Sequence, residues 1–307
     1  MKVACVSTAG HQLVLNNIAP ACGFQYFDDI NYIGVAEFNP GVIYFGGWFV
    51  SEYSDWALHR SLLGDIPKVI IHWFGSDVLM AKRWMANGER RMFEELRSDR
   101  YCHIPPSDEI KEELENWLQL PVTDPLNVPA EKVRIPIAKP DKFMVGCYMP
   151  PSRQDFFRMS VIRDAIPLTR KTGIVFYNWL PPTQEIEYQA TCQKRYALSP
   201  AEYDQVIADT SCLLRIPIHD AYSISAAEYL MSGRPVVSDR DLPHWPAWIK
   251  GKLTNKKVAA ALTEARHDGD VPEDTVKFYQ DMYDPALFKG RLEERCRQRW
   301  KGFRFAD

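Results

Sequence analysis

The sequence predicts two tandem α/β domains, each built on a doubly wound parallel sheet. Three observations predict this fold class. Short β-rich runs alternate with helical patterns along the chain, which is typical of parallel sheets with helices on both faces. Five prolines fall between Pro121 and Pro140, where they disfavour a helix and indicate a linker. The alternating pattern then begins again, and a length of 307 residues suits two domains.

The first half begins with a buried strand over residues 3–7. Further strands are expected at residues 41–45, 68–73 and 101–104, with helices at 52–63 and 108–118. Ser107 is the expected N-cap of the second helix. The strand exits at Gly10-His11, Gly46-Gly47 and Gly75–Asp77 are Gly-rich or polar. Ligands of open α/β sheets bind at this carboxyl edge.

The second half repeats the scheme. Strands are expected at residues 143–147, 173–177, 212–216 and 235–238, with helices at 154–166, 200–208 and 225–232. A charged helical tail follows, from about residue 272 to residue 300. We therefore expect two Rossmann-like domains, residues 1–140 and 141–307, with a cleft between the carboxyl ends of their strands.

Composition argues against several classes of protein. The net charge is −3, and residues 1–140 are more acidic than the remainder, so the overall charge does not indicate a nucleic-acid binder. The seven cysteines are scattered without a Cys-x-x-Cys pair, which disfavours a disulfide framework or zinc site and favours a cytoplasmic setting. We expect neither a signal peptide nor a membrane span of roughly 20 apolar residues.

The segment from Leu213 to Asp239 carries the clearest chemical signal. It reads as strand, polar loop, helix rich in small residues, glycine and strand. The start of such a helix offers unpaired amides and a partial positive charge, which suit a diphosphate. Glu228 lies one turn into the helix, where it can accept hydrogen bonds from ribose hydroxyls, and Asp220 lies in the preceding loop. The residues expected to line the donor at the helix start are Tyr222, Ser223, Ile224 and Ser225.

This segment resembles the donor site of the retaining, family-four-like glycosyltransferases of GT-B fold (glycosyl transferases group 1). The family pattern is an acidic residue, seven intervening residues, a Glu, and then small-Gly-x-Pro-Val. The matching residues here are Asp220, Glu228, Gly233, Pro235 and Val236. The first acid of the family is usually Glu, so Asp220 departs from the pattern.

The family also opens its second domain with Val-Gly, followed by a basic pair that contacts the donor phosphates. Val145-Gly146 and Arg153 match that opening, and Arg158 is a weak substitute for the second basic residue. The resemblance covers residues 143–240 closely and the rest only in architecture.

The resemblance implies sugar transfer from a nucleotide diphosphate sugar, such as a UDP- or GDP-sugar, to an acceptor hydroxyl with retained configuration. Asp220 would orient the sugar, and Glu228 would hold the ribose. Arg153 and the amides near Ser223–Ser225 would stabilise the leaving diphosphate, so no metal or other cofactor is required. The acceptor would be a glycan, a lipid or a small molecule bound mostly by residues 1–140.

A structural interpretation of the donor motif stays open. Ser225-x-x-Glu228 also matches a capping box, which stabilises any helix start. Gly233 also matches an ordinary residue after a helix end. Together with Asp220, Arg153 and the tandem domains, these residues favour a donor site.

His11, His72 and Asp77 are further catalytic candidates at strand exits of the first half. In some inverting GT-B enzymes a His at the position of His11 deprotonates the acceptor, and a pKa near 6.5 suits that role. In retaining relatives the Gly10 amide would instead contact the donor phosphate, and a His at position 72 would lie next to the sugar. The alternatives are a His11 satisfied within its loop, a His72 buried in the sheet, and Asp77 as a helix N-cap.

The acceptor-binding candidates are Gly47, Trp73, Gly75, Lys82 and Arg83. Trp73, like its neighbour Phe74, could stack on a sugar or base, or pack in the core. The basic cluster consists of Lys82, Arg83, Trp84, Arg90 and Arg91.

A phosphate-bearing acceptor such as DNA would favour this basic cluster, whereas a solvated helix face balanced by nearby glutamates is the alternative. The first rival function is therefore a DNA glycosyltransferase that acts on a hydroxymethylated base, as in phage base modification. The second is a non-catalytic nucleotide-sugar-binding protein, and a phosphorylase-like or epimerase relative is the third.

Overall fold

The computed structural model describes residues 1–7, 17–28, 32–48, 64, 66–88, 90–150, 153–169, 172–178, 192–219 and 223–305. Within those ranges, every helix is too short or too polar to cross a membrane. The contacts divide the chain into two compact units. The first comprises Met1–Lys132 with Tyr283–Asp307, and the second comprises Val133–His219 with Ser223–Met282. Relative to the expected domains, contacts group residues 133–140 with the second unit and the carboxyl-terminal helix with the first.

The first unit contains a sheet of five parallel strands in the order β2-β1-β3-β4-β5. The strands are β1 (Val3–Ser7), β2 (Gln25–Asp28), β3 (Val42–Gly46), β4 (Val69–His72) and β5 (Tyr101–Ile104). Because β1 pairs with β2 on one side and with β3 on the other, the strand order reverses between β1 and β3.

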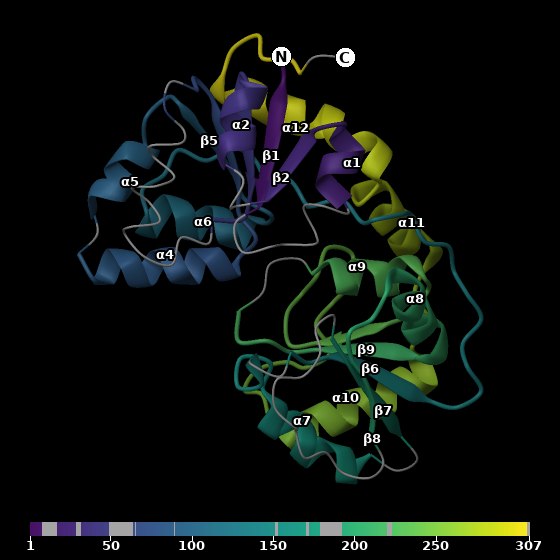
Figure 1. The fold of residues 1–307 in the computed structure, drawn as a ribbon. Helices are drawn as coiled ribbons and strands as arrows, with labels where there is room; N and C mark the ends of the chain where they lie inside the picture. Colours follow the sequence, from purple (N-terminus) through teal and green to yellow (C-terminus); the bar gives the residue numbers. More distant parts are fainter. Residues whose placement is uncertain are drawn as a thin grey trace. The chain divides into compact units, whose positions relative to one another are not determined.

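Helices cover both faces of this sheet (Figure 1). They are α1 (Ala19–Cys22), α2 (Tyr32–Phe38), α4 (Ser76–Ala86), α5 (Arg90–Leu96), α6 (Asp108–Trp117) and α12 (Pro285–Arg299). One face packs its aliphatic side chains against α2, α4, α5 and α6. On the other face, α12 returns from the far end of the chain to pack against α1 and β5.

The second unit contains another five-stranded parallel sheet, in the order β10-β9-β6-β7-β8. Its strands are β6 (Met144–Tyr148), β7 (Gly173–Tyr177), β8 (Cys192–Arg195), β9 (Cys212–Arg215) and β10 (Val236–Ser238). The chain builds outward from β6 through β7 to β8 and then returns to place β9 on the other side of β6. The strand order therefore reverses between β6 and β9.

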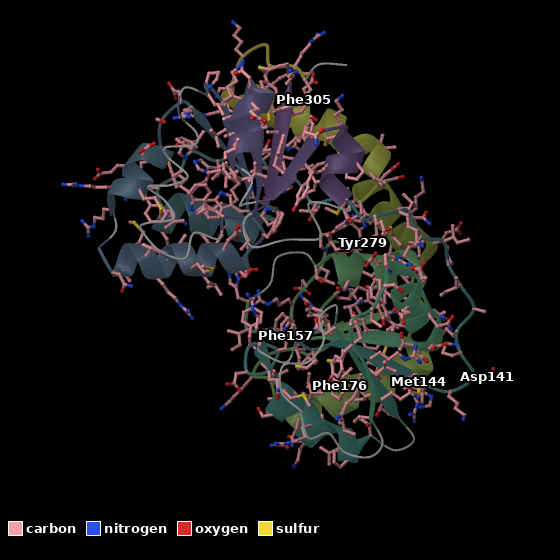
Figure 2. All side chains as sticks on the ribbon, in the orientation of Figure 1. Asp141, Met144, Phe157, Phe176, Tyr279 and Phe305 are labelled. Carbon is pink, nitrogen blue, oxygen red and sulfur yellow. The ribbon has the colours of Figure 1, made fainter. Side chains whose placement is uncertain are left out.

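Helices also cover both faces of the second sheet. They are α7 (Met159–Ala165), α8 (Pro200–Asp209), α9 (Ile224–Met231), α10 (Asn255–Asp268) and α11 (Glu273–Met282). α7 and α10 enclose a core that includes Phe157 and Phe176, both labelled in Figure 2. α8 and α9 pack against the opposite face, and α11 packs on α9. Two doubly wound α/β units confirm the predicted fold class.

Most expected strands form within one residue of their predicted ends, which is within the ordinary variation of strand assignment. Ser107 caps α6 as predicted, with its Oγ accepting a hydrogen bond from Ile110 N at 3.3 Å. The helix expected at 154–166 begins only at Met159, because Arg158 adopts a left-handed φ of 54°. The carboxyl-terminal tail forms two helices, α11 and α12, and Pro285 begins the second. The helix expected at 52–63 lies outside the described residues.

Gly146, at the centre of β6, is the point where α9 rests on the sheet. The Tyr229 hydroxyl of α9 lies directly over its Cα, and a Cβ at position 146 would overlap that hydroxyl. Tyr229 is fully buried, and its hydroxyl lies 2.8 Å from Thr210 Oγ1. A residue without a side chain at position 146 therefore sets how closely α9 approaches the sheet.

Candidate functional site

The strand-order reversal of the second sheet places the carboxyl ends of β6 and β9 side by side. Tyr148 ends β6 and Arg215 ends β9. The Arg215 guanidinium lies 5.8 Å from the Tyr148 ring centroid and 5.2 Å from that of Phe157. These distances are typical of cation–π contacts, and ligands of open α/β sheets bind at such a reversal. Arg215 is absent from the predicted site residues, although a charged residue ending the apolar strand Cys-Leu-Leu-Arg is a visible signal.

α9 begins next to this edge, and its start differs from the structural interpretation of the sequence. Ser223 is the N-cap, and its side chain makes no capping hydrogen bond. Ile224 and Ser225 form the first turn, so the predicted capping box of Ser225 and Glu228 is wrong. The first-turn amides carry the partial positive charge of the helix, which favours an anion. Gly233, with a φ of 70°, follows the helix end as expected of an ordinary C′ residue.

Glu228 is almost completely buried and takes part in a network of charges. Its Oε1 accepts hydrogen bonds from Arg134 Nη2 at 3.1 Å and Nε at 3.3 Å. Arg134 Nη1 donates to Asp204 Oδ1 at 2.6 Å, and the guanidinium lies 5.4 Å from the Tyr203 ring centroid. Burial raises the pKa of Glu228, while Arg134 and Tyr203 oppose that rise. Arg134, Asp204 and Tyr203 are all absent from the predicted site residues.

The two predicted phosphate-binding arginines have different surroundings. Arg153 is exposed, in the turn after β6, where its backbone N donates to Pro150 O at 3.0 Å. Within the described ranges, Arg153 forms no ion pair with an acidic side chain. Arg158 is ion-paired with Asp239, the residue after β10. Arg153 is therefore better placed than Arg158 to receive an external anion.

Four predicted site residues, namely Gly10, His11, Asp220 and Tyr222, lie outside the described residues. Their proposed roles in the donor loop and in proton transfer stay predictions.

His72 is buried in the sheet, which is the alternative that its sequence position left open. Its side chain is fully enclosed. Nδ1 accepts a hydrogen bond from the Tyr44 hydroxyl at 2.6 Å, and Nε2 donates to Leu126 O at 2.7 Å. Burial lowers the pKa of His72 from 6.5 to about 4. Because both ring nitrogens are engaged, His72 as placed presents no nitrogen to a substrate, and its catalytic role stays a prediction.

Asp77 is also fully buried, in the first turn of α4. Gly75 is the N-cap of this helix, so the alternative of Asp77 as N-cap is wrong. The Asp77 carboxylate instead accepts hydrogen bonds from the backbone N of Trp48 at 2.8 Å, Phe74 at 3.0 Å and Val78 at 3.0 Å. Burial raises the pKa of Asp77 from 3.8 to about 6, although these amides oppose the rise. The carboxylate thereby ties the exit of β4 to the exit of β3.

Three of the predicted acceptor residues have structural roles in the first unit. Trp73 is fully buried and packs in the core, with its Nε1 donating to His103 Nδ1 at 3.4 Å. Gly47 and Gly75 have φ values of 85° and 98°, which side chains disfavour. Gly47 N donates to His72 O at 2.8 Å. These glycines therefore shape the strand exits.

Lys82 and Arg83 of the basic cluster lie on α4. Lys82 is ion-paired with Glu113 of α6 at 3.1 Å, and its Nζ lies 5.3 Å from the Trp117 ring centroid. Arg83 is exposed. Part of the basic cluster is thus neutralised by a residue on a neighbouring helix. No group of three or more metal-ligating side chains occurs within the described part of the chain.

No family model matches the sequence, and no curated protein matches it. The structure is similar to that of HepE from Anabaena in complex with UDP-glucose, with a TM-score of 0.74, 10% identity, and coverage of 97% of this chain and 100% of that chain. The sucrose-phosphate synthase of Thermosynechococcus elongatus gives a TM-score of 0.68, 11% identity, and coverage of 97% and 99%. WaaG, a glycosyltransferase involved in lipopolysaccharide biosynthesis, gives a TM-score of 0.61 and 11% identity, with coverage of 98% of this chain and 100% of that chain. The chain therefore has the GT-B fold over nearly its whole length.

Proposed function

We propose that this chain is a glycosyltransferase that holds a nucleotide diphosphate sugar on its second unit, at the edge where β6 and β9 end. The carrying observation is the start of α9, which lies next to the strand-order reversal without a side-chain cap, with the buried carboxylate of Glu228 one turn inside. HepE and WaaG, which share the fold, support this donor class, because one is described with UDP-glucose and the other as a glycosyltransferase.

In the proposed donor site, different residues contact the diphosphate, the ribose and the sugar. The diphosphate would lie at the first turn of α9, with Arg153 and Arg215 balancing its charge. Glu228 would accept hydrogen bonds from the ribose hydroxyls, and Asp220 would orient the sugar. As the bond between the anomeric carbon and the diphosphate oxygen breaks, the acceptor oxygen bonds to that carbon. The acceptor proton passes to the departing diphosphate, and preorganised donors stabilise the negative charge that develops there.

Retention of configuration, a cytoplasmic location and a UDP- or GDP-sugar remain parts of this proposal. The acceptor is left unassigned among glycans, lipids and small molecules. The ion pair of Lys82 with Glu113 reduces the positive charge on which the DNA alternative depends. That alternative stays a prediction, which duplex DNA carrying hydroxymethylated bases would test directly.

Thermal unfolding with a panel of nucleotide sugars tests the donor proposal. We expect UDP-glucose, UDP-galactose, UDP-N-acetylglucosamine, GDP-mannose or ADP-glucose to raise the melting temperature by roughly 5–10 °C at about 100 times its Kd. Glu228→Gln is expected to reduce the shift, because an amide is a poorer acceptor for two hydroxyls. Glu264→Gln, on the exposed face of α10, is the matched control and is expected to leave the shift unchanged.

A turnover assay on the same protein then distinguishes an enzyme from a non-catalytic binding protein. Release of the nucleoside diphosphate from the stabilising donor, reduced in Asp220→Asn, is the expected result. Stabilisation without any release, with or without added acceptors, would indicate the non-catalytic alternative. A panel in which no donor shifts the melting temperature would overturn the proposal.

A further inference from the structure

Arg134 lies in the extended segment that follows Lys132, at the start of the second unit. Neighbouring residues Val133 and Ile135 are exposed, whereas the Arg134 side chain turns inward and is 9% exposed. Its backbone is fixed as well, because Gln280 Nε2 of α11 donates to Arg134 O at 2.8 Å. A charged side chain that is buried while its apolar neighbours face solvent reverses the usual pattern.

The Arg134 guanidinium connects two helices. Nη2 and Nε both reach Glu228 Oε1 of α9, and Nη1 reaches Asp204 Oδ1 of α8. The Tyr203 ring supports the guanidinium plane. Because both contacts to Glu228 converge on Oε1, the Arg134 fork fixes the orientation of the carboxyl group and leaves acceptor capacity on its second oxygen.

We propose that Arg134 is a positioning residue that holds the Glu228 carboxylate ionised and aimed at the ribose of the donor nucleotide. This inference rests on the proposed function and adds a residue to it. A buried carboxylate without a paired cation tends to take up a proton, and a protonated Glu228 would accept fewer hydrogen bonds from a vicinal diol. Arg134 would therefore determine how strongly the site distinguishes ribose from 2′-deoxyribose without touching the nucleotide.

The other groups facing Glu228 do not replace this cation. Asp204 adds negative charge, and the Tyr177, Tyr203 and Tyr229 side chains, from β7, α8 and α9, are neutral at physiological pH because burial raises their pKa values. Arg215 instead makes cation–π contacts with Tyr148 and Phe157 at the end of β9. Removing Arg134 is thus expected to raise the pKa of Glu228 further.

Calorimetric titration of UDP, GDP and ADP, each beside its 2′-deoxy counterpart, tests the inference. We expect the wild-type protein to prefer the ribose form of its nucleotide by about tenfold or more, as for a hydrogen bond to a charged group. Arg134→Met is expected to reduce the preference to about twofold and to weaken ribonucleotide binding as the pH falls from 8 to 6. Arg134→Lys, which keeps the charge but cannot form the fork, is expected to lie between them.

Arg163→Met, on the exposed surface of α7, is the matched control and is expected to behave as the wild type. Circular dichroism verifies that each variant is folded, and if Arg134→Met is not, Arg134→Lys provides the comparison. A folded Arg134 variant that keeps the full preference and the wild-type pH profile overturns the inference and leaves the proposed function intact. Wild-type binding without any ribose preference also overturns the inference and contradicts the ribose role of Glu228, while nucleotide binding itself still supports the proposed donor class. A wild-type protein that binds none of the three nucleotides instead contradicts the proposed function itself.

Discussion

Lowering the pH from 7.5 to 5 is expected to destabilise the first unit by about 2–3 kcal/mol, because this unit buries two histidines in their neutral form. Burial lowers the pKa values of His72 and His103 from 6.5 to about 4. Between these values the unfolded chain binds more protons than the folded one, so stability falls as the pH drops below 6.5. At pH 5 each histidine accounts for roughly 2 kcal/mol.

Asp77 acts in the opposite direction. Its pKa is raised from 3.8 to about 6, so the folded state binds the proton more tightly and gains stability as the pH falls through 6. At pH 5 this gain offsets roughly 1 kcal/mol of the stability that the two histidines lose. The two histidines therefore outweigh the one carboxylate over this pH range.

Hydrogen exchange followed by mass spectrometry measures this effect locally in the full chain. Peptides covering β4 and β5 are expected to lose protection at pH 5, after correction for the intrinsic exchange rate. Peptides covering β6 and β7 of the second unit serve as the internal control. His103→Gln, which keeps a donor for Leu96 O, is expected to reduce the net pH dependence by about two thirds, because one histidine then remains against the opposing effect of Asp77. Protection of β4 and β5 that does not change with pH would contradict the assignment of neutral buried histidines.

Gly146→Ala is expected to lower the free energy of unfolding of the second unit by about 2–4 kcal/mol. The added methyl group would overlap the Tyr229 hydroxyl, so α9 must shift or the tyrosine must leave its position over β6. Either movement also breaks the 2.8 Å contact between Tyr229 and Thr210, which contributes about 1 kcal/mol. Urea unfolding, followed by exchange in peptides covering β6 and α9, gives the measurement.

A double-mutant cycle identifies the cause. Tyr229→Phe alone is expected to cost about 1 kcal/mol, and the pair Gly146→Ala/Tyr229→Phe is expected to cost less than the sum of the single changes. Gly173→Ala is the matched control, because a Cβ there meets only the flexible end of the Met144 side chain; a loss below about 1 kcal/mol is expected. Strict additivity in the cycle would show that the overlap with Tyr229 is not the source of the instability.

The buried strands were predictable from the sequence because fully buried parallel strands appear as short apolar runs between turn residues. The edge strands β2 and β8 were not predicted, because they are polar or partly exposed and lack such a run. The same logic located the Gly-rich strand exits. It could not assign Gly75 as the N-cap of α4, because Asp77 is the residue with a capping side chain. In the structure the carboxylate of Asp77 accepts hydrogen bonds from three backbone amides, including Trp48 N at a distant strand exit. Sequence spacing carries no information about the contact with Trp48.

The strand and helix that carry the proposed donor motif were predictable for a similar reason, since their residues follow one another along the chain. Arg134 was not, because it lies 94 residues before Glu228 in an alternating apolar stretch where arginine suggests a solvent-facing position. Arg215 was overlooked although it ends an apolar strand. Both side chains acquire their surroundings only when the sheet brings separate segments together.

The return of α12 to the first unit has a consequence for the order of events during synthesis. Segments Met1–Lys132 and Tyr283–Asp307 belong to the same unit, so the second unit interrupts the first along the chain. The ring of Phe288 stacks on His72 at 6.1 Å and helps to close one face of the first sheet. On the ribosome, the second unit has all its strands available before that face can be covered. The part of the chain made first is thus the last to be completed, and until then the face that α12 covers stays open, a condition that favours aggregation of folding intermediates.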